Sequence, residues 1–269
     1  MFMLIDSHCH LDAALFAADR GAVLARAQER GISDLVVPAV GLDTWPPILA
    51  LARRKSVPKV HAALGVHPVS LAELAAERDP DLLSALEAEL QATHGELVAV
   101  GECGLDAAID LSRADFTRQE RVLVAQLELA RRFGLPVILH ARGAQANRRL
   151  LELCSRHALG PQGGVVHSYS GGADLVPSFA ALGLYFGFAG PATYPDARRV
   201  RASIAAVPLE RLLIETDAPD QTPAPHRPGR CEPSYLADVL EAVAAARHLP
   251  AAELALQTTA NARRLFALD

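Results

Sequence analysis

Short apolar runs recur along the whole chain, and nearly all of them are continuous rather than interrupted by polar residues. Strands of a parallel sheet show this pattern because both of their faces are buried. The runs predict eight strands, at 2–5, 35–40, 59–66, 97–100, 136–139, 164–166, 184–188 and 211–214.

Stretches rich in Ala, Leu, Glu and Arg at helical spacing separate these runs. They predict helices at 12–30, 71–93, 113–133 and 232–248, and a last helix within 250–269. Gly31, Gly95, Gly134 and Gly183 precede the next strands, so we expect them to end helices in the left-handed conformation. The alternation favours a single-domain α/β fold over residues 1–269, a (β/α)8 TIM-type barrel. A doubly wound open sheet is the alternative.

Composition narrows the class of protein without changing the predicted fold. The 269 residues are 51% hydrophobic, which allows a large core, and the formal net charge is −5. A generally basic surface for duplex nucleic acid is therefore absent, although a local basic groove stays open. Four scattered cysteines form no CxxC pair, which indicates reduced thiols in a cytoplasmic enzyme. No segment is typical of a signal peptide or a membrane span, so we expect no membrane partner.

Histidines and carboxylates follow six of the eight apolar runs, where the chain leaves each predicted strand. His8 and His10 share one face if the first strand extends to them, because side chains alternate with period two. The complete set is His8, His10, His67, Glu102, Asp106, His140, His167 and Asp217. In a barrel these positions converge at the carboxyl ends of the strands, where active sites lie. Such a cluster of imidazoles and carboxylates predicts a metal centre.

The candidate ligands are nitrogen and oxygen atoms, which favours a catalytic centre over a closed structural zinc site. Glu102 has two oxygens and would bridge two ions. One ion would be held by His8, His10 and Asp217, and the other by His140 and His167. Two divalent ions about 3.5–4 Å apart activate water and clamp the oxygens of a displacement. The ligand types admit Zn²⁺, Mn²⁺ or Ni²⁺ and suit Mg²⁺ less well, because Mg²⁺ prefers oxygen ligands.

Six motifs in a fixed order carry a resemblance to a known family. They are DSHCHLD from Asp6, GVHP from Gly65, GECGLD from Gly101, LPVILHAR from Leu135, VVHSYSGG from Val165 and ETDAP from Glu215. Together they resemble the TatD family of metal-dependent deoxyribonucleases, in the amidohydrolase-like superfamily. The resemblance covers nearly the whole chain, from Asp6 to TTANARRLF near its end.

The resemblance implies a TIM-type barrel with a divalent metal centre. The family's metal residues match His8, His10, Glu102, His140, His167 and Asp217 of this chain. The activity implied is hydrolysis of DNA phosphodiesters, often as a 3′→5′ exonuclease that needs Mg²⁺ or a similar ion.

The chain departs from the family's pattern beside these residues. Ala107 and Ala108 follow GLD where an aromatic residue is usual, Gly143 replaces an acid, Asp220 an aromatic and Cys231 an Asn. An aromatic surface on which a base stacks is worth about 1–3 kcal/mol, so these departures bear on the substrate.

The sequence leaves the roles of several residues open. Asp217 and Glu102 are the candidate catalytic residues, and Asp217 is either a pure ligand or also the general base. The candidate substrate-binding residues are His67, Arg142 and Arg227. Arg142 would hold a phosphate with its planar guanidinium or form a salt bridge to Asp106. The alternatives are a structural histidine for His67 and a solvated loop charge for Arg227.

Three functions compete. The leading one is a divalent-metal-dependent hydrolase that cleaves DNA phosphodiester bonds with a metal-activated water, acting on single strands or 3′ ends. The second is a metal-dependent hydrolase of a small-molecule ester, lactone or amide, which the mild acidity and the missing aromatics favour. The third is a non-catalytic scaffold, against which the complete ligand set argues. The sequence leaves the oligomeric state open, a monomer included.

Overall fold

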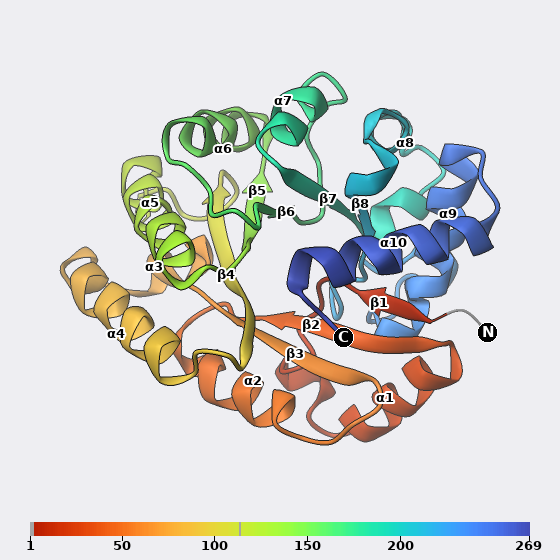
Figure 1. Cartoon of the computed structure of the whole chain (residues 1–269), viewed down its shortest axis with the longest axis horizontal. Helices are drawn as coiled ribbons and strands as arrows, with labels where there is room; N and C mark the ends of the chain where they lie inside the picture. Colours follow the sequence, from red (N-terminus) through yellow and green to blue (C-terminus); the bar gives the residue numbers. More distant parts are fainter. Residues whose placement is uncertain (1–2, 113) are drawn as a thin grey trace.

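The computed structural model describes residues 3–112 and 114–269. Its eight parallel strands pair in chain order, as β1 Leu4–Asp6, β2 Ile32–Pro38, β3 Lys59–Leu64, β4 Leu97–Asp106, β5 Val137–Arg142, β6 Gly164–Val166, β7 Leu184–Phe188 and β8 Leu212–Ile214. Beyond the paired strands, Ser7 N donates to Ile214 O at 3.2 Å and Asp217 N donates to His8 O at 2.9 Å. The last strand is thereby joined to the first, and the strands form the predicted barrel, nearly closed (Figure 1).

The interior of the barrel is filled by one buried side chain from each strand. These are Ile5, Val36, Ala63, Ala99, Ile138, Val165, Tyr185 and Leu213. Helix α10 (Ala251–Phe266) adds Ala262, Leu265 and Phe266 to the same cluster and crosses the barrel in Figure 1. Thr259 Oγ1 donates to Met3 O and Asn261 Nδ2 to Leu212 O, at the starts of β1 and β8. α10 therefore closes the amino end of the barrel, and the carboxyl end is left for a site.

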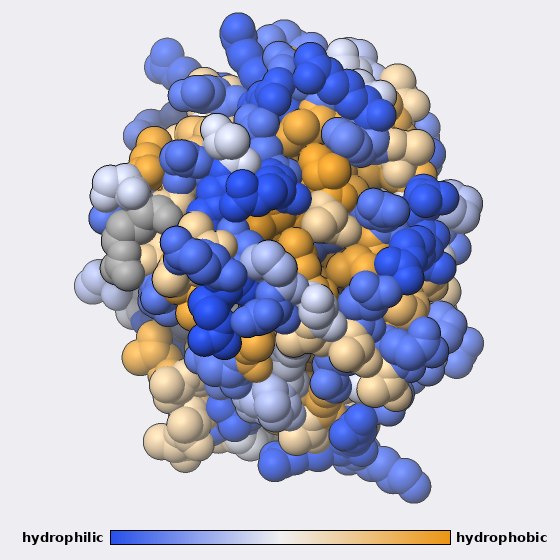
Figure 2. Space-filling view, turned by 90° about the vertical axis from the view of Figure 1, so that its left-hand side faces the viewer, coloured by the Kyte–Doolittle hydropathy of each residue, from blue (hydrophilic) through white to orange (hydrophobic). Residues whose placement is uncertain are grey.

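A ring of helices surrounds the strands, with a second apolar cluster between the two layers. The helices are α1 Arg20–Glu29, α2 Trp45–Ala52, α3 Pro68–Glu73, α4 Asp79–Ala92, α5 Phe116–Phe133, α6 Ala144–Arg156, α7 Val176–Ala181, α8 Arg198–Ala206 and α9 Leu236–Arg247. Cys9 and Cys103 belong to this outer cluster, so they face away from the barrel axis. Figure 2 shows the side that bears α3, α4 and α5, where hydrophilic side chains surround a hollow lined by hydrophobic ones. Among the described residues, no helix combines the length and the apolar composition needed to cross a bilayer.

The strands at 164–166 and 184–188 have the predicted bounds, and the others differ at their ends. β4 differs most, because it continues past Val100 to Asp106 in register with β5. Glu102 is therefore a strand residue and does not follow the strand. The predicted starts at 59 and 97 and the predicted end at 214 agree with the structure, and the remaining bounds are wrong by one to three residues. Position 2 lies outside the described residues.

The predicted helices agree less well with the structure than the predicted strands do. Residues 12–19 of the predicted helix 12–30 form a loop with a short 3-10 turn, Ala14–Phe16. The predicted helix 71–93 is two helices, because the buried guanidinium of Arg118 donates to the carbonyls of Leu71 and Leu74 and pairs with Asp79. Helices α2, α6, α7 and α8 were not predicted, and position 113 lies outside the described residues.

The four glycines expected to end helices are confirmed in that conformation. Gly31, Gly95, Gly134 and Gly183 have φ of 85°, 94°, 65° and 83°. Each lets the chain reverse toward the next strand, which returns every strand to the same end of the barrel.

Candidate metal centre

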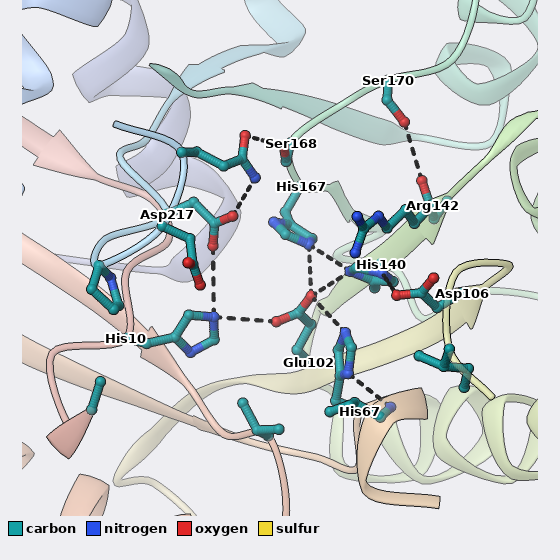
Figure 3. A pocket seen from close by; sticks show the side chains of 18 of the residues that line it. His10, His67, Glu102, Asp106, His140, Arg142, His167, Ser168, Ser170 and Asp217 are labelled. Carbon is teal, nitrogen blue, oxygen red and sulfur yellow. Dashed lines mark hydrogen bonds and ion pairs between the residues drawn. The ribbon is translucent and has the colours of Figure 1, made fainter. Parts of the chain in front are cut away.

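A pocket of about 900 Å³ opens at the carboxyl ends of the strands (Figure 3). Its lining includes most of the predicted site residues: His10, His67, Glu102, Asp106, His140, Arg142, His167 and Asp217. His8 is completely buried behind the lining, and its Nε2 lies 3.3 Å from Glu102 Oε2. The structure therefore brings all six predicted metal residues together, and Arg227 alone of the predicted site residues lies apart from the cluster.

Glu102 lies at the centre of the cluster. Its Oε1 is 2.6 Å from His167 Nε2 and 2.8 Å from His140 Nδ1. Its Oε2 is 3.3 Å from His8 Nε2 and 3.6 Å from His10 Nε2. Although burial opposes ionisation, the surrounding histidines hold the pKa of Glu102 well below its ordinary value. The two oxygens of one carboxylate therefore face two separate groups of imidazole nitrogens.

The first group consists of His8, His10 and Asp217. The two Nε2 atoms lie 3.3 Å apart, and Asp217 Oδ1 lies 3.5 Å from His8 Nε2 and 3.6 Å from His10 Nε2. A point equidistant from these three atoms is about 2 Å from each, which is the length of a Zn–N or Zn–O bond. Burial and the nearby charge of His167 lower the pKa of His8, so its ring is neutral and can donate a lone pair. Spacing and donor types thus fit a divalent ion.

The second group consists of His140 and His167 beside Glu102 Oε1. His140 Nδ1 and His167 Nε2 lie 3.1 Å apart. Burial opposes protonation of both rings, but hydrogen bonds to Asp106 and Glu102 raise the pKa of His140, and the charge of Glu102 holds the pKa of His167 well above its ordinary value. A divalent ion bound here would replace the protons between Glu102 Oε1 and the two ring nitrogens, because a nitrogen that ligates a metal must be deprotonated.

His67 is held in one tautomer by the helix that follows it. It is the N-cap of α3, and its Nδ1 accepts a hydrogen bond from Val69 N at 3.0 Å. Burial lowers the pKa of His67 to about 3, so the ring is neutral and its proton is on Nε2, 3.4 Å from Glu102 Oε1. His67 with Asp106 and His140 has the spacing of a third ligand set. An Nε2–H group has no lone pair for a metal, so His67 is a hydrogen-bond donor to the pocket.

Two buried carboxylates stand behind the second group. Asp106 Oδ2 lies 3.1 Å from His140 Nε2, the ring nitrogen that faces away from Glu102. Glu215 Oε1 lies 3.7 Å from His167 Nδ1, which is too long for a hydrogen bond. Carboxylates in such positions orient metal-ligating histidines and raise their basicity. Among the described residues, the Nδ1 atoms of His8, His10 and His167 are buried and have no hydrogen-bond partner.

The sequence contains signals for both carboxylates, of which only Asp106 was among the predicted residues of the cluster. Asp106 was considered as a partner of Arg142, but it pairs with His140, so that alternative is wrong. It lies four residues beyond Glu102 on one strand, on the same face. Glu215 was not singled out. Its carboxylate occupies the space where a side chain of Gly187 would lie, and glycine inside a strand marks such a close approach.

Gln221 and Ser168 hold the carboxylate of Asp217 through linked hydrogen bonds. Asp217, Ser168 and Gln221 have φ of 56°, 42° and 52°, which is the left-handed region. Gln221 Nε2 donates to Asp217 Oδ2, and Gln221 Oε1 accepts a hydrogen bond from Ser168 Oγ at 2.8 Å. Non-glycine residues in this region cost about 1–3 kcal/mol each and cluster at functional sites. The sequence gave no signal for this interlock, because it joins the turns after two different strands.

Asp6, the last residue of β1, positions the turn that carries Asp217. It is fully buried and accepts hydrogen bonds from Thr216 N at 2.9 Å and Thr216 Oγ1 at 2.6 Å. Burial raises the pKa of Asp6 to about 8, against the opposing effect of these hydrogen bonds. The contact ties the residue before Asp217 to the strand that leads to His8, so both ligands of the first group share one support.

The two predicted arginines have different environments. Arg142 ends β5, is exposed and lines the pocket. It forms no ion pair with any residue that the structure describes, which leaves its guanidinium available to an anion. Arg227 is exposed on the loop after β8 and lies over the ring of Tyr194, 4.9 Å from the ring centroid.

Comparison with known proteins identifies the family. The model of the family described as TatD related DNase matches residues 5–267. The chain is 38% identical to a metal-dependent hydrolase of Escherichia coli K12 named YjjV, over 97% of each chain. It is 34% identical to the 3′-5′ ssDNA/RNA exonuclease TatD of Shigella flexneri, over 98% of this chain and 99% of that protein.

Comparison with solved structures supports the same family assignment. The crystal structure of YjjV from E. coli K12 superposes with a TM-score of 0.90 at 37% identity, covering 99% of this chain and 98% of that one. A Saccharomyces cerevisiae amidohydrolase superposes with a TM-score of 0.87 at 19% identity, covering 99% of this chain and 100% of that one, and shows the fold alone. The chain therefore belongs to the TatD family of metal-dependent hydrolases.

Proposed function

We propose that this protein is a divalent-metal-dependent nuclease that removes nucleotides from the 3′ ends of single-stranded DNA. The observation that carries the proposal is Glu102, whose two oxygens face two groups of metal-binding atoms at the floor of an open pocket. The substrate comes from the likeness to relatives named as 3′-5′ ssDNA/RNA exonucleases. The pocket opens to solvent, as access for a polymer end requires.

We assign the metal-binding role to His8, His10, Glu102, His140, His167 and Asp217. The two groups favour two ions, with Glu102 shared between them. Mixed imidazole and carboxylate donors suit Mn²⁺, Zn²⁺ or Ni²⁺, and Mg²⁺ less well. Bound divalent ions supply Lewis-acid activation of a phosphoryl oxygen and of the attacking water.

The chain's own residues then complete the hydrolysis. Asp217 Oδ1 accepts the proton of the attacking water as general base, while Gln221 holds its other oxygen. Arg142 binds a non-bridging phosphate oxygen with its free guanidinium. His67 donates its Nε2 hydrogen to a substrate oxygen and, with a pKa of about 3, serves as a hydrogen-bond donor and not as an acid. Water attacks phosphorus, the P–O3′ bond breaks, and the leaving O3′ oxygen takes up a proton from solvent.

Digestion by metal-stripped protein tests this function. A single-stranded oligonucleotide labelled at its 5′ end is incubated with stripped protein, with Mg²⁺, Mn²⁺ or Zn²⁺ restored separately. We expect a ladder of products shortened from the 3′ end only after metal is restored, and none with Glu102→Gln. Glu29→Gln, the same substitution at an exposed residue at the end of α1, keeps the activity. Equal digestion without metal, or none by protein shown to hold metal, contradicts the proposal.

A second candidate function is hydrolysis of a small-molecule ester, lactone or amide. The observation in its favour is the pocket itself, whose described lining has no Phe, Tyr or Trp and includes Arg142 as its one arginine or lysine. Stacked bases and several phosphates would lack partners inside it. A panel of esters, lactones and amides, tested beside the oligonucleotide with the same metal-loaded protein, separates the two functions.

We also propose a cytoplasmic location. All four cysteines, Cys9, Cys103, Cys154 and Cys231, are free and buried, which is typical of proteins from reducing compartments.

A further inference from the structure

The mouth of the pocket has two unlike halves. The loops after β1 to β4 carry exposed large apolar side chains: Leu15, Leu42, Val69 and Leu111. Val69 lines the pocket, and the other three each lie within two residues of a lining residue, Ala13, Thr44 or Ile109. This half therefore presents an apolar rim.

Among the described residues, the exposed charges of the same half are mostly acidic. Asp12, Asp43, Glu73 and Glu77 lie on or beside these loops. Of the described cations there, Arg20 donates to the carbonyls of Leu11 and Asp12, and Arg78 pairs with Asp81. This half of the mouth would therefore offer a polyanion little electrostatic attraction.

The loops after β5 to β8 and the first turns of the helices that follow them are different. They carry the exposed arginines Arg142, Arg148, Arg198, Arg199 and Arg227. None of them forms an ion pair with any residue of 3–112 or 114–269. The exposed acids of this half are Asp174, Asp196 and Asp220, so arginine predominates.

Three of these arginines form a series along the edge of the pocket. Arg142 lines it. The guanidinium of Arg199 lies beside Gly172, two residues beyond the lining residue Ser170. Arg227 lies over Tyr194, whose hydroxyl donates to Thr222 O, next to the lining residue Gln221. Free guanidinium groups at successive loops of one rim suit the successive phosphates of a single strand.

We propose that single-stranded DNA enters the pocket across the β5–β8 half of the mouth, with its backbone phosphates on Arg142, Arg199 and Arg227. The proposal rests on the nuclease function proposed above. The 3′-terminal phosphodiester lies over the metal centre, and the strand upstream of it lies on the arginine edge. The acidic, apolar half opposite excludes the strand and leaves it one path. A net charge of −5 is thus compatible with a polyanionic substrate, because the arginines are local.

The test compares two double variants of equal charge. Arg199→Gln with Arg227→Gln removes two positions of the proposed path. Arg30→Gln with Arg156→Gln removes two exposed arginines that stand where α1 and α6 end, at the closed end of the barrel. The metal-loaded proteins are assayed on a single-stranded 20-mer from low to moderate salt. Bis(p-nitrophenyl) phosphate is assayed in parallel, because it is too small to span from the metal centre to the outer arginines.

We expect the path variant to lose at least tenfold more activity on the 20-mer than on the small phosphodiester. We also expect its log–log salt dependence for the 20-mer to become shallower by about 1.4, since each phosphate contact on a single strand contributes about 0.7. The control variant keeps both activities and the original salt dependence. A path variant that matches the control, with the 20-mer still digested, overturns the path alone. Hydrolysis of the small phosphodiester by wild-type protein without digestion of the 20-mer overturns the nuclease function and the path with it.

Discussion

The two sides of the metal centre are built differently. On the side of His140 and His167, His140 Nε2 lies 3.1 Å from the buried carboxylate of Asp106, and His167 Nδ1 lies 3.7 Å from that of Glu215, beyond hydrogen-bond distance. On the side of His8 and His10, the corresponding Nδ1 atoms are buried without a hydrogen-bond partner among the described residues. A hydrogen-bonded carboxylate, as at His140, orients a ligand and raises its basicity, and among the described residues His8 and His10 have no such contact behind them.

From this difference we infer that the two proposed ions are held unequally. The side of His140 and His167 has one ring aligned by a hydrogen-bonded carboxylate before an ion arrives, so we expect it to bind the tighter ion. The side of His8 and His10 depends on Asp217, whose turn is held by Gln221 and Asp6. We expect this side to release its ion first when metal is removed.

The largest effect is expected where the two sides join. Glu102→Gln removes the charge of the carboxylate that both sides share, so both should lose metal. We expect less than one ion per chain by elemental analysis of dialysed protein, and a fall in kcat of at least about 100-fold. Glu29→Gln is the matched control. Retention of two ions by Glu102→Gln would show that the carboxylate does not join the sides.

Asp106→Asn sharpens the comparison by removing one backing carboxylate. The amide can present its NH₂ group to His140 Nε2, which favours the wrong tautomer and turns a proton toward the metal. We expect affinity for the tighter ion to fall about 10–100-fold, measured by titration with a competing chelator. Asp43→Asn, an exposed substitution at the mouth, should leave it unchanged. Equal loss of both ions would contradict an effect confined to one side.

His67 should make metal-stripped protein sensitive to acid. Its folded-state pKa is about 3 against an ordinary value of 6.5, so below pH 6.5 the unfolded chain takes up a proton that the folded chain refuses. The resulting loss in the free energy of unfolding is close to zero above pH 6.5. It increases as the pH falls toward 3, by up to about 1.4 kcal/mol per pH unit.

His67→Asn tests this contribution, because asparagine also accepts a hydrogen bond at an N-cap but does not titrate. Urea unfolding of both stripped proteins at pH 6 and pH 5 should show the free energy of unfolding of the variant rising relative to that of the wild type by about 1.2 kcal/mol as the pH falls. A constant difference in the free energy of unfolding at the two pH values would mean that His67 is protonated in the folded state.

The smallest effect is expected from the support of Asp217. Gln221→Ala removes the amide that donates to Asp217 Oδ2 and accepts from Ser168. One such hydrogen bond is worth about 0.5–1.5 kcal/mol, so kcat should fall about 2–10-fold, with the tighter ion retained. Loss of the tighter ion in this variant would contradict the separation of the two sides.

The sequence predicted the parts of the protein that depend on local pattern. Continuous apolar runs located all eight strands, and the barrel then brought residues as distant as His8 and Asp217 together, because strand ends converge whatever their separation in the chain. Helix α6 was missed, because it is rich in polar residues. β4 extends six residues further than its apolar run because Gly104 and Asp106 pair with β5.

The support of the site could not be predicted in the same way. Gln221, Ser168 and Asp217 meet through left-handed turns after different strands, and no periodic pattern encodes such turns. The tautomer of His67 follows from one hydrogen bond to a helix whose start the sequence placed three residues too late. Ligand identity depends on strand register, but ligand orientation depends on these individual contacts.

One titration tests the central claim, that an unequally supported two-ion centre hydrolyses single-stranded DNA. Metal-stripped protein receives Mn²⁺ in steps, and the same samples are assayed for bound metal and for shortening of a 5′-labelled oligonucleotide. We predict two binding steps of different affinity, no digestion in stripped protein, and full digestion only after the second step. Digestion that is complete with a single ion, or two ions bound with no digestion, would contradict the account.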